Sequence, residues 1–102
     1  MATARITFFK AGVSSGGDIM QAAQAGTLRF EDITPTASNQ QTTITANVGD
    51  FVHIAAIGAS LVASDGVSPN VVTNGGVGIP DGSSFIIGGL AAGSKVAVAT
   101  VS

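Results

Sequence analysis

The feature that most constrains this chain is the alternation of turn residues with short apolar runs over residues 65–101. Glycine, proline, asparagine and aspartate recur there every few positions. Glycine permits positive φ angles and proline presets φ for a turn, so each cluster favours a change in chain direction. Short β-branched runs between such clusters are typical of strands. This stretch therefore predicts a small all-β domain, with strands near residues 70–73, 84–87 and 95–101.

The earlier part of the chain shows the same spacing. Residues 4–10 alternate, with Ile6 and Phe8 on one face. Residues 27–34 also alternate, and we expect Leu28 and Phe30 to face inward and Arg29 and Glu31 outward. Three further strands are expected over residues 41–46, 51–57 and 60–64. Seven or eight short strands in a single domain, residues 1–102, indicate a β-sandwich, a jelly roll or a barrel.

Two of these expected strands carry information about their surroundings. The threonine-rich residues 41–46 suit an exposed or edge position. Residues 51–57 are apolar on both faces, which indicates burial on both sides by a second layer or a neighbouring subunit. Because tryptophan and tyrosine are absent, the aromatic core is expected to come from the five phenylalanines, Phe8, Phe9, Phe30, Phe51 and Phe85.

The segment 11–26 leaves two alternatives open. Its first part is rich in glycine and serine, which favours a flexible arm. Asp18 and Gln21 have the spacing of a helix capping box, and Gly26 could end a helix. A helix this short is not stable without packing. The sequence is thus compatible with a short surface helix or with an extended arm.

The charge content limits the partners of this protein. Charged residues make up 10% of the chain, against about 25% in an ordinary soluble domain. A poorly charged surface favours contact with other protein, so we expect an oligomer or an assembly component. The four basic residues are scattered, which argues against nucleic-acid binding. No apolar run approaches the roughly 20 residues of a membrane span, and no signal peptide is visible.

No catalytic, cofactor-binding or metal-binding constellation is found in the sequence. His53 is the single histidine and lies in an apolar run, where a hydrogen-bonded packing role is expected. The chain has no cysteine, which excludes disulfides and thiolate metal sites. No Gly-x-Ser-x-Gly motif is present, and the glycines of residues 75–78 lack the pattern of a phosphate loop. Turn and surface roles are expected for the carboxylates Asp18, Glu31, Asp32, Asp50, Asp65 and Asp81. We therefore expect no enzymatic activity.

Several motifs resemble those of small virion proteins of tailed bacteriophages. The run SLVASDGVSPN at residues 60–70 is similar to a strand–Gly–x–x–Pro element of that group. The GIPDG motif at residues 78–82 and the GLAAGSKVAV motif at residues 89–98 resemble its C-terminal part. The N-terminal ARITFFKAG and the Gln-Thr-rich segment before Gly49 are also similar, so the resemblance covers most of the chain.

This resemblance implies a capsid decoration or cement protein that binds and stabilises the assembled phage head. It further implies a homotrimer, the major capsid protein as partner, and a place on the capsid surface after synthesis in the host bacterial cytoplasm. A tail or neck adaptor of the virion is one alternative. A small ligand-binding β-domain is another, although sugar binding would favour exposed tryptophan or tyrosine.

A cement role would place the contacts in exposed or loosely ordered segments. The expected segments are residues 1–5, 11–26 and 36–40. Five residues are the candidate protein-interface set: Arg5, Phe9, Arg29, Glu31 and Asp32.

Overall fold

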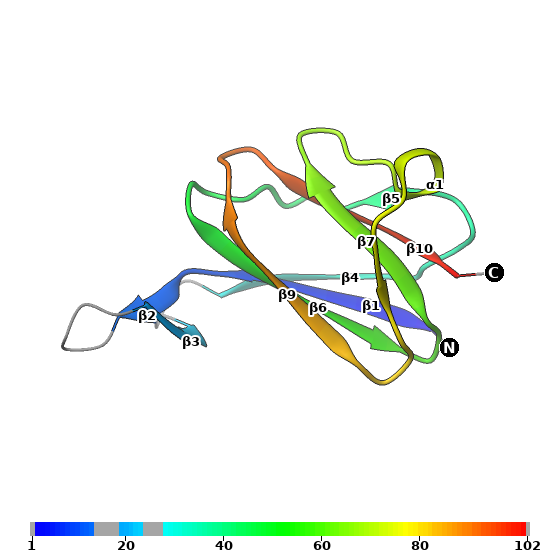
Figure 1. Ribbon diagram of the computed structural model, residues 1–102, viewed down its shortest axis with the longest axis horizontal. Coiled ribbons are helices and arrows are strands. Elements are labelled where there is room, and N and C mark those ends of the chain that lie inside the picture. The colour runs from blue at the N-terminus through cyan, green and yellow to red at the C-terminus, as the bar shows by residue number, and fades with distance from the viewer. Residues whose placement is uncertain (1, 14–18, 24–27, 102) are drawn as a thin grey trace.

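The computed structural model describes residues 2–13, 19–23 and 28–101, which form two packed antiparallel sheets (Figure 1). The first sheet has the order β4-β1-β6-β9, with bounds β1 Thr3–Phe9, β4 Arg29–Ile33, β6 Asp50–Ile57 and β9 Ser84–Leu90. The second sheet has the order β5-β10-β7-β8, with bounds β5 Gln40–Gln41, β7 Leu61–Gly66, β8 Val77–Ile79 and β10 Lys95–Thr100. The all-β prediction is confirmed, and of the three architectures expected the chain adopts a sandwich.

The hydrophobic core lies between the two sheets. Strands β1 and β6 present every second side chain to it. The alternation of residues 4–10 predicts this for β1, whereas residues 51–57, apolar on both faces, do not show which side of β6 is inward. The second sheet contributes from β7, β8 and β10. The largest apolar side chains that are fully buried between the sheets are Ile6, Phe8, Val52, Ile54, Leu61, Ile79, Val96 and Val98.

The outer face of the second sheet is partly covered by the single-turn helix α1 (Val71–Asn74). Val71 packs against Ala97 and Ala99 of β10. The strand expected at residues 70–73 is therefore wrong. The cause is local, because the Asn70 side chain accepts hydrogen bonds from the N–H groups of residues 72 and 73 and caps a helical turn.

Two other expected strands differ from the structure in extent. Of residues 41–46, only Gln41 belongs to a strand, and β5 is an edge strand as expected. The rest is an irregular segment tied to β10 by hydrogen bonds from Thr42 N to Val96 O and from Ala46 N to Ser94 O. Strand β8 is not among the expected strands, because the glycines before and within it are typical of turns.

The strands β2 (Ala11–Val13) and β3 (Ile19–Ala23) form a separate hairpin that continues from the end of β1. Figure 1 shows this hairpin projecting beyond the end of the sandwich. The extended alternative for this segment is confirmed over these two strands, and the helix alternative is wrong for residues 19–23. The expected helix caps Asp18 and Gly26 lie outside the described residues.

The alternation expected for residues 27–34 is present, but its two faces are exchanged. Leu28 and Phe30 are 60% and 64% exposed, whereas Ile33 is buried. Arg29 and Glu31 point to the side of the sandwich interior. A shift of one residue in register moves every side chain to the opposite face, so the hydrophobic pattern of a short edge strand is easily overruled by its partners.

Candidate functional site: the outer face of the first sheet

The side of the first sheet that points away from the second sheet, called the outer face below, is the candidate site. The strand register brings four residues into one row across it: Phe30 of β4, Thr7 of β1, His53 of β6 and Ile86 of β9. Ile86 is 40% exposed, and His53 is half-buried. No described element packs over this row in the way that α1 packs over the second sheet.

One end of the outer face is aromatic. The rings of Phe9 and Phe51 are stacked with their centroids 5.9 Å apart. The Phe51 ring also lies directly on the backbone of Gly88, where a Cβ atom would come within 2.5 Å of it. Only glycine permits so close an approach of a ring to the strand. Phe9 is buried by these contacts although it lies on the outer face.

The β4 side of the outer face offers exposed apolar surface. Leu28 and Phe30 line an open depression of about 340 Å³ together with Arg5 and Thr7. These two apolar side chains were expected in the core. Their exposure gives the outer face the anchors typical of protein-binding surfaces, a large aromatic ring and an aliphatic side chain beside it.

A salt bridge borders this apolar surface. The Arg5 guanidinium donates from Nε to Asp32 Oδ1 and from a terminal nitrogen to Oδ2, both at 2.9 Å. These hydrogen bonds, with a smaller contribution from the opposite charge, hold the pKa of Asp32 below its ordinary value. The same pairing raises the pKa of Arg5. The pair is solvent-exposed, so its main effect is to fix both side chains beside the depression rather than to stabilise the fold.

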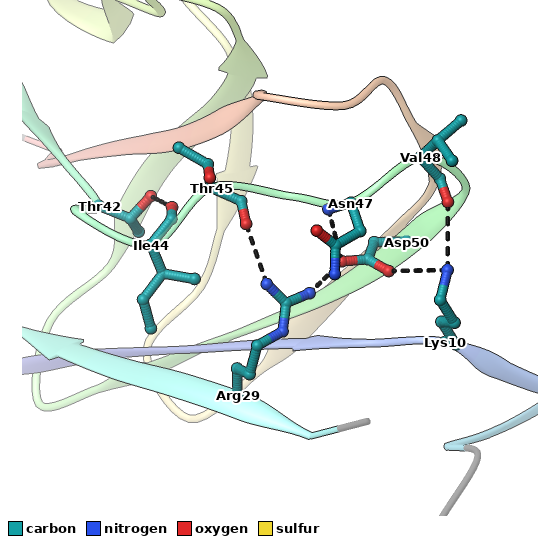
Figure 2. A network of polar contacts seen from close by, with 8 residues as sticks. All are labelled: Lys10, Arg29, Thr42, Ile44, Thr45, Asn47, Val48 and Asp50. Atoms are coloured by element: carbon teal, nitrogen blue, oxygen red, sulfur yellow. Dashed lines mark hydrogen bonds and ion pairs between the residues drawn. The ribbon is translucent and has the colours of Figure 1, made fainter. Parts of the chain in front are cut away.

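The inner side of β4 carries a different, buried ion pair, shown in Figure 2. Asp50 is fully buried and forms a salt bridge with Arg29. The Arg29 guanidinium also donates to Thr45 O at 2.9 Å and lies 5.6 Å from the centroid of the Phe8 ring. The Arg29 side chain thus faces inward because a buried carboxylate and a carbonyl oxygen both require it.

The carboxylate of Asp50 has two further partners. Its Oδ2 accepts from the backbone N–H of Asn47 at 2.9 Å. The Lys10 ammonium lies 3.7 Å from Oδ1 and donates to Val48 O at 3.3 Å (Figure 2). The expected surface role of Asp50 is therefore wrong, although its expected hydrogen bond to the turn backbone is present. The turn buries the carboxylate because β6 starts at this residue.

Glu31 is the second inward contact of β4. Its Oε1 accepts hydrogen bonds from the backbone N–H groups of Thr43 and Ile44 and from the Thr43 hydroxyl, at 2.9–3.1 Å. These are the donors of the irregular segment that follows β5. Glu31 thus links the edge of the first sheet to the second layer, by the kind of charge-assisted bond that is stronger than a neutral one.

The structure divides the five candidate interface residues into two groups. Arg5 and Asp32 are paired on the outer face, with Phe9 buried at its aromatic end. Arg29 and Glu31 point inward and are engaged within the chain. The exposed residues Leu28, Phe30 and Ile86 were missed, because their apolar character predicts burial and the sequence holds no signal for the opposite face.

The other residues singled out in the sequence lie in different parts of the fold. His53 makes no hydrogen bond to the described residues through its ring, so the expected hydrogen-bonded role is not present there. Residues 51–57 are covered on the core side, and their other side forms the middle of the outer face. Phe30 and Phe85 are exposed rather than in the core. Asp81 has the expected turn role and accepts from Gly58 N at 2.8 Å.

The described residues contain no group of three or more histidine, aspartate or glutamate side chains that could hold a metal ion. Within the same residues, no helix has the length and apolar character required to cross a membrane. Comparison with protein-family models, with curated proteins and with solved structures gave no match to this chain.

Proposed function

We propose that this protein is a structural virion protein, a decoration or cement protein that binds the assembled head of a tailed bacteriophage and stabilises it. The observation that carries the proposal is the exposed apolar surface of the outer face, with Leu28, Phe30 and Ile86. Apolar surface gathered on one face of a soluble protein marks a contact with another macromolecule. In this role the protein catalyses no reaction and requires no cofactor.

Two sequence features support the same role. The low charge content leaves much of the surface suited to contact with protein rather than with solvent. The motifs at residues 60–70, 78–82 and 89–98 resemble those of small phage virion proteins. From this resemblance we take the partners: the major capsid protein, on the capsid surface, and further copies of the chain arranged as a trimer.

The outer face would supply affinity and orientation separately. Burial of Leu28 and Phe30 against the shell would contribute about 25 cal/mol for each Å² of apolar surface removed from water. The paired charges of Arg5 and Asp32 would set the orientation at the rim, since exposed charges mostly affect specificity and encounter. The rigid sandwich behind them keeps the face in one shape.

Stabilisation then follows from binding alone. A protein that binds only the assembled shell stabilises it by about 2.7 kcal/mol per site at a hundredfold excess over Kd. Repeated over many sites on a particle, this modest contribution gives a large resistance to heat and to internal pressure.

The test uses particles of the virus that encodes the chain, stripped of this protein and then supplied with purified protein. Stripped particles are expected to release their DNA at a lower temperature, and wild-type protein to restore the difference. The double variant Leu28→Ser/Phe30→Ser is expected to bind at least about tenfold more weakly, since each buried large apolar side chain contributes about 1.5–3 kcal/mol. Val48→Ser/Val67→Ser is the matched control, because it removes two exposed valines outside the outer face.

Equal thermal release from stripped and complete particles would contradict the cement role. Binding of the protein to isolated tails or necks instead of heads would favour the adaptor role. Equal binding by the two double variants would show that the outer face is not the contact surface. Native mass spectrometry gives the number of copies, for which three is expected.

A further inference from the structure

The four edge strands of the sandwich differ in how well they are protected against pairing with another strand. Natural sheets protect their edges by short strands, charges, proline or bulges. In the second sheet the edges are β5 and β8, with two and three residues. In the first sheet β4 carries Arg29, Glu31 and Asp32. Strand β9 has seven residues and contains neither a charge nor a proline.

The neutral stretch around β9 is longer than the strand itself. No charged residue occurs between Asp81 and Lys95. The run Ser84–Ile87 combines high β-propensity with low charge, which is the composition of segments that add to other strands. Figure 1 shows β9 beside β6, and the sheet order places it at the end of the first sheet.

The register shows which backbone groups of β9 are left open. Ala56 of β6 is hydrogen-bonded to the two residues that precede β9: its N–H donates to Ser83 O, and its carbonyl oxygen accepts from Gly82 N. In an antiparallel pair the hydrogen-bonded positions alternate, so the backbone N–H and C=O groups of Phe85 and Ile87 point toward β6. The N–H and C=O groups of Ser84 and Ile86 therefore point away from the sheet. Within the described chain they make no hydrogen bond to another strand.

We propose that β9 is a self-association edge, at which β9 of a second copy of this chain adds in antiparallel orientation. The identity of the strand that pairs with β9 follows from charge and symmetry. A neutral apolar edge disfavours a charged strand, and among the edge strands of the sandwich only β9 is both neutral and longer than three residues. Antiparallel pairing of identical strands is self-complementary about a two-fold axis, which is the commonest symmetry of homo-oligomers. With the axis at Phe85, Ser84 of each copy lies opposite Ile86 of its partner, so the outward N–H and C=O groups of both residues are satisfied.

The pairing joins the two first sheets into one eight-stranded sheet. It places the two outer faces side by side, so Ile86 of each copy lies opposite Ser84 of its partner. The bulge at residues 88–89, where Gly89 has a φ of +71°, limits the pairing to the first part of β9. This inference rests on the proposal that the protein is a homo-oligomer, but not on its binding to a phage head. The contact is two-fold, so in combination with a trimer it would link trimers in pairs.

The test is hydrogen–deuterium exchange of the full chain at several protein concentrations, together with sedimentation velocity. The Phe85 and Ile87 amides are expected to be protected at all concentrations, because they bond to β6. The Ser84 and Ile86 amides are expected to become protected only at concentrations where the sedimentation coefficient reports association. Such an alternating pattern is specific to strand pairing and would not result from a contact through side chains.

Two variants and one control complete the test. Ile86→Pro removes the outward N–H, and Ser84→Lys adds a charge to the edge; each is expected to raise the self-dissociation constant about tenfold or more, since a two-fold contact repeats the change. Ser84→Lys serves as the second variant if Ile86→Pro does not fold, as judged by circular dichroism. Ile86→Thr keeps the backbone donor and is expected to retain most of the association.

Protein that remains monomeric at all concentrations would overturn the inference, as would association without protection of the Ile86 amide. The separate variant Leu28→Ser/Phe30→Ser is expected to retain concentration-dependent protection of Ile86 while it loses head binding. Failure of strand pairing and failure of the cement role are therefore distinguishable.

Discussion

The two edges of the first sheet, β4 and β9, are stabilised in different ways. Strand β4 is linked to the rest of the chain by polar contacts, since Arg29 pairs with buried Asp50 and Glu31 holds the backbone after β5. Strand β9 carries no charge and is held by the ladder to β6, by Leu90 and Ile87 in the core and by the contact of Gly88 with Phe51. The comparison shows that charges on an edge strand can serve two purposes, anchoring the strand and preventing it from pairing with another chain.

The largest effect is expected for Arg29→Met, which breaks the polar anchor of β4. Asp50 then remains buried, with Lys10 as its charged neighbour among the described residues and a hydrogen bond from the backbone of Asn47. Breaking a buried ion pair costs about 3–5 kcal/mol of stability. Because the Arg29 side chain is partly exposed, we expect the free energy of unfolding to fall by about 3 kcal/mol, the lower end of this range. Chemical denaturation measures it. Lys95→Met is the control, because Lys95 forms no ion pair with the described residues.

A second substitution at this pair tests whether the unpaired charge of Asp50 causes the loss of stability. Arg29→Met combined with Asp50→Leu should recover much of the stability, since it removes the charge that the single variant leaves unpaired. An unchanged denaturation midpoint for Arg29→Met alone would mean that the ion pair does not anchor β4.

Glu31→Ala removes the other polar anchor of β4. Three donors on Thr43 and Ile44 lose their charged acceptor, which we expect to lower the free energy of unfolding by about 2 kcal/mol. Faster amide exchange at residues 43 and 44 is expected as well. Asp65→Ala serves as the control, since Asp65 is exposed. Unchanged exchange at both amides would contradict the role assigned to Glu31.

A smaller effect is expected for Gly88→Ala, which tests the packing of β9. The added methyl would overlap the Phe51 ring, and such overpacking costs about 1–3 kcal/mol; we expect the lower half, because the ring lies on the outer face. Gly78→Ala is a matched control, as its Cβ would meet no atom within 4 Å. If both variants unfold at the same denaturant concentration, the packing of the Phe51 ring does not require a glycine at position 88.

The smallest effect concerns the exposed pair of Arg5 and Asp32. Because its pKa is lower in the folded protein, Asp32 adds stability above its unfolded pKa of about 3.9, and this contribution is lost as the pH falls through the folded value. The stability difference between wild type and Arg5→Met should therefore narrow from pH 7 to pH 2. A difference that is constant with pH would show that the pair is not formed in solution.

The sequence could predict those elements whose signals are local. Alternation gave β1 with the correct face inward, because Ile6 and Phe8 are large and apolar, whereas the apolar run 51–57 gave β6 without distinguishing its two faces. The turns at Gly49 and Gly82 were also predictable, since both have the positive φ that turn glycines adopt. The residues of the outer face were harder to predict from the sequence. Arg5 and Asp32 were identified from their charge, whereas the exposed Leu28 and Phe30 were placed in the core.

By itself, the sequence determined an all-β domain, its main strands and its shortage of charge, since these depend on composition and on neighbours along the chain. Only the tertiary structure decided which face of β4 points inward and which edge stays open. The physical reason is that both depend on residues distant in sequence. Arg29 faces inward because Asp50, 21 residues away, is buried and needs a partner. Strand β9 is an edge because the sheet order places no described strand on its other side.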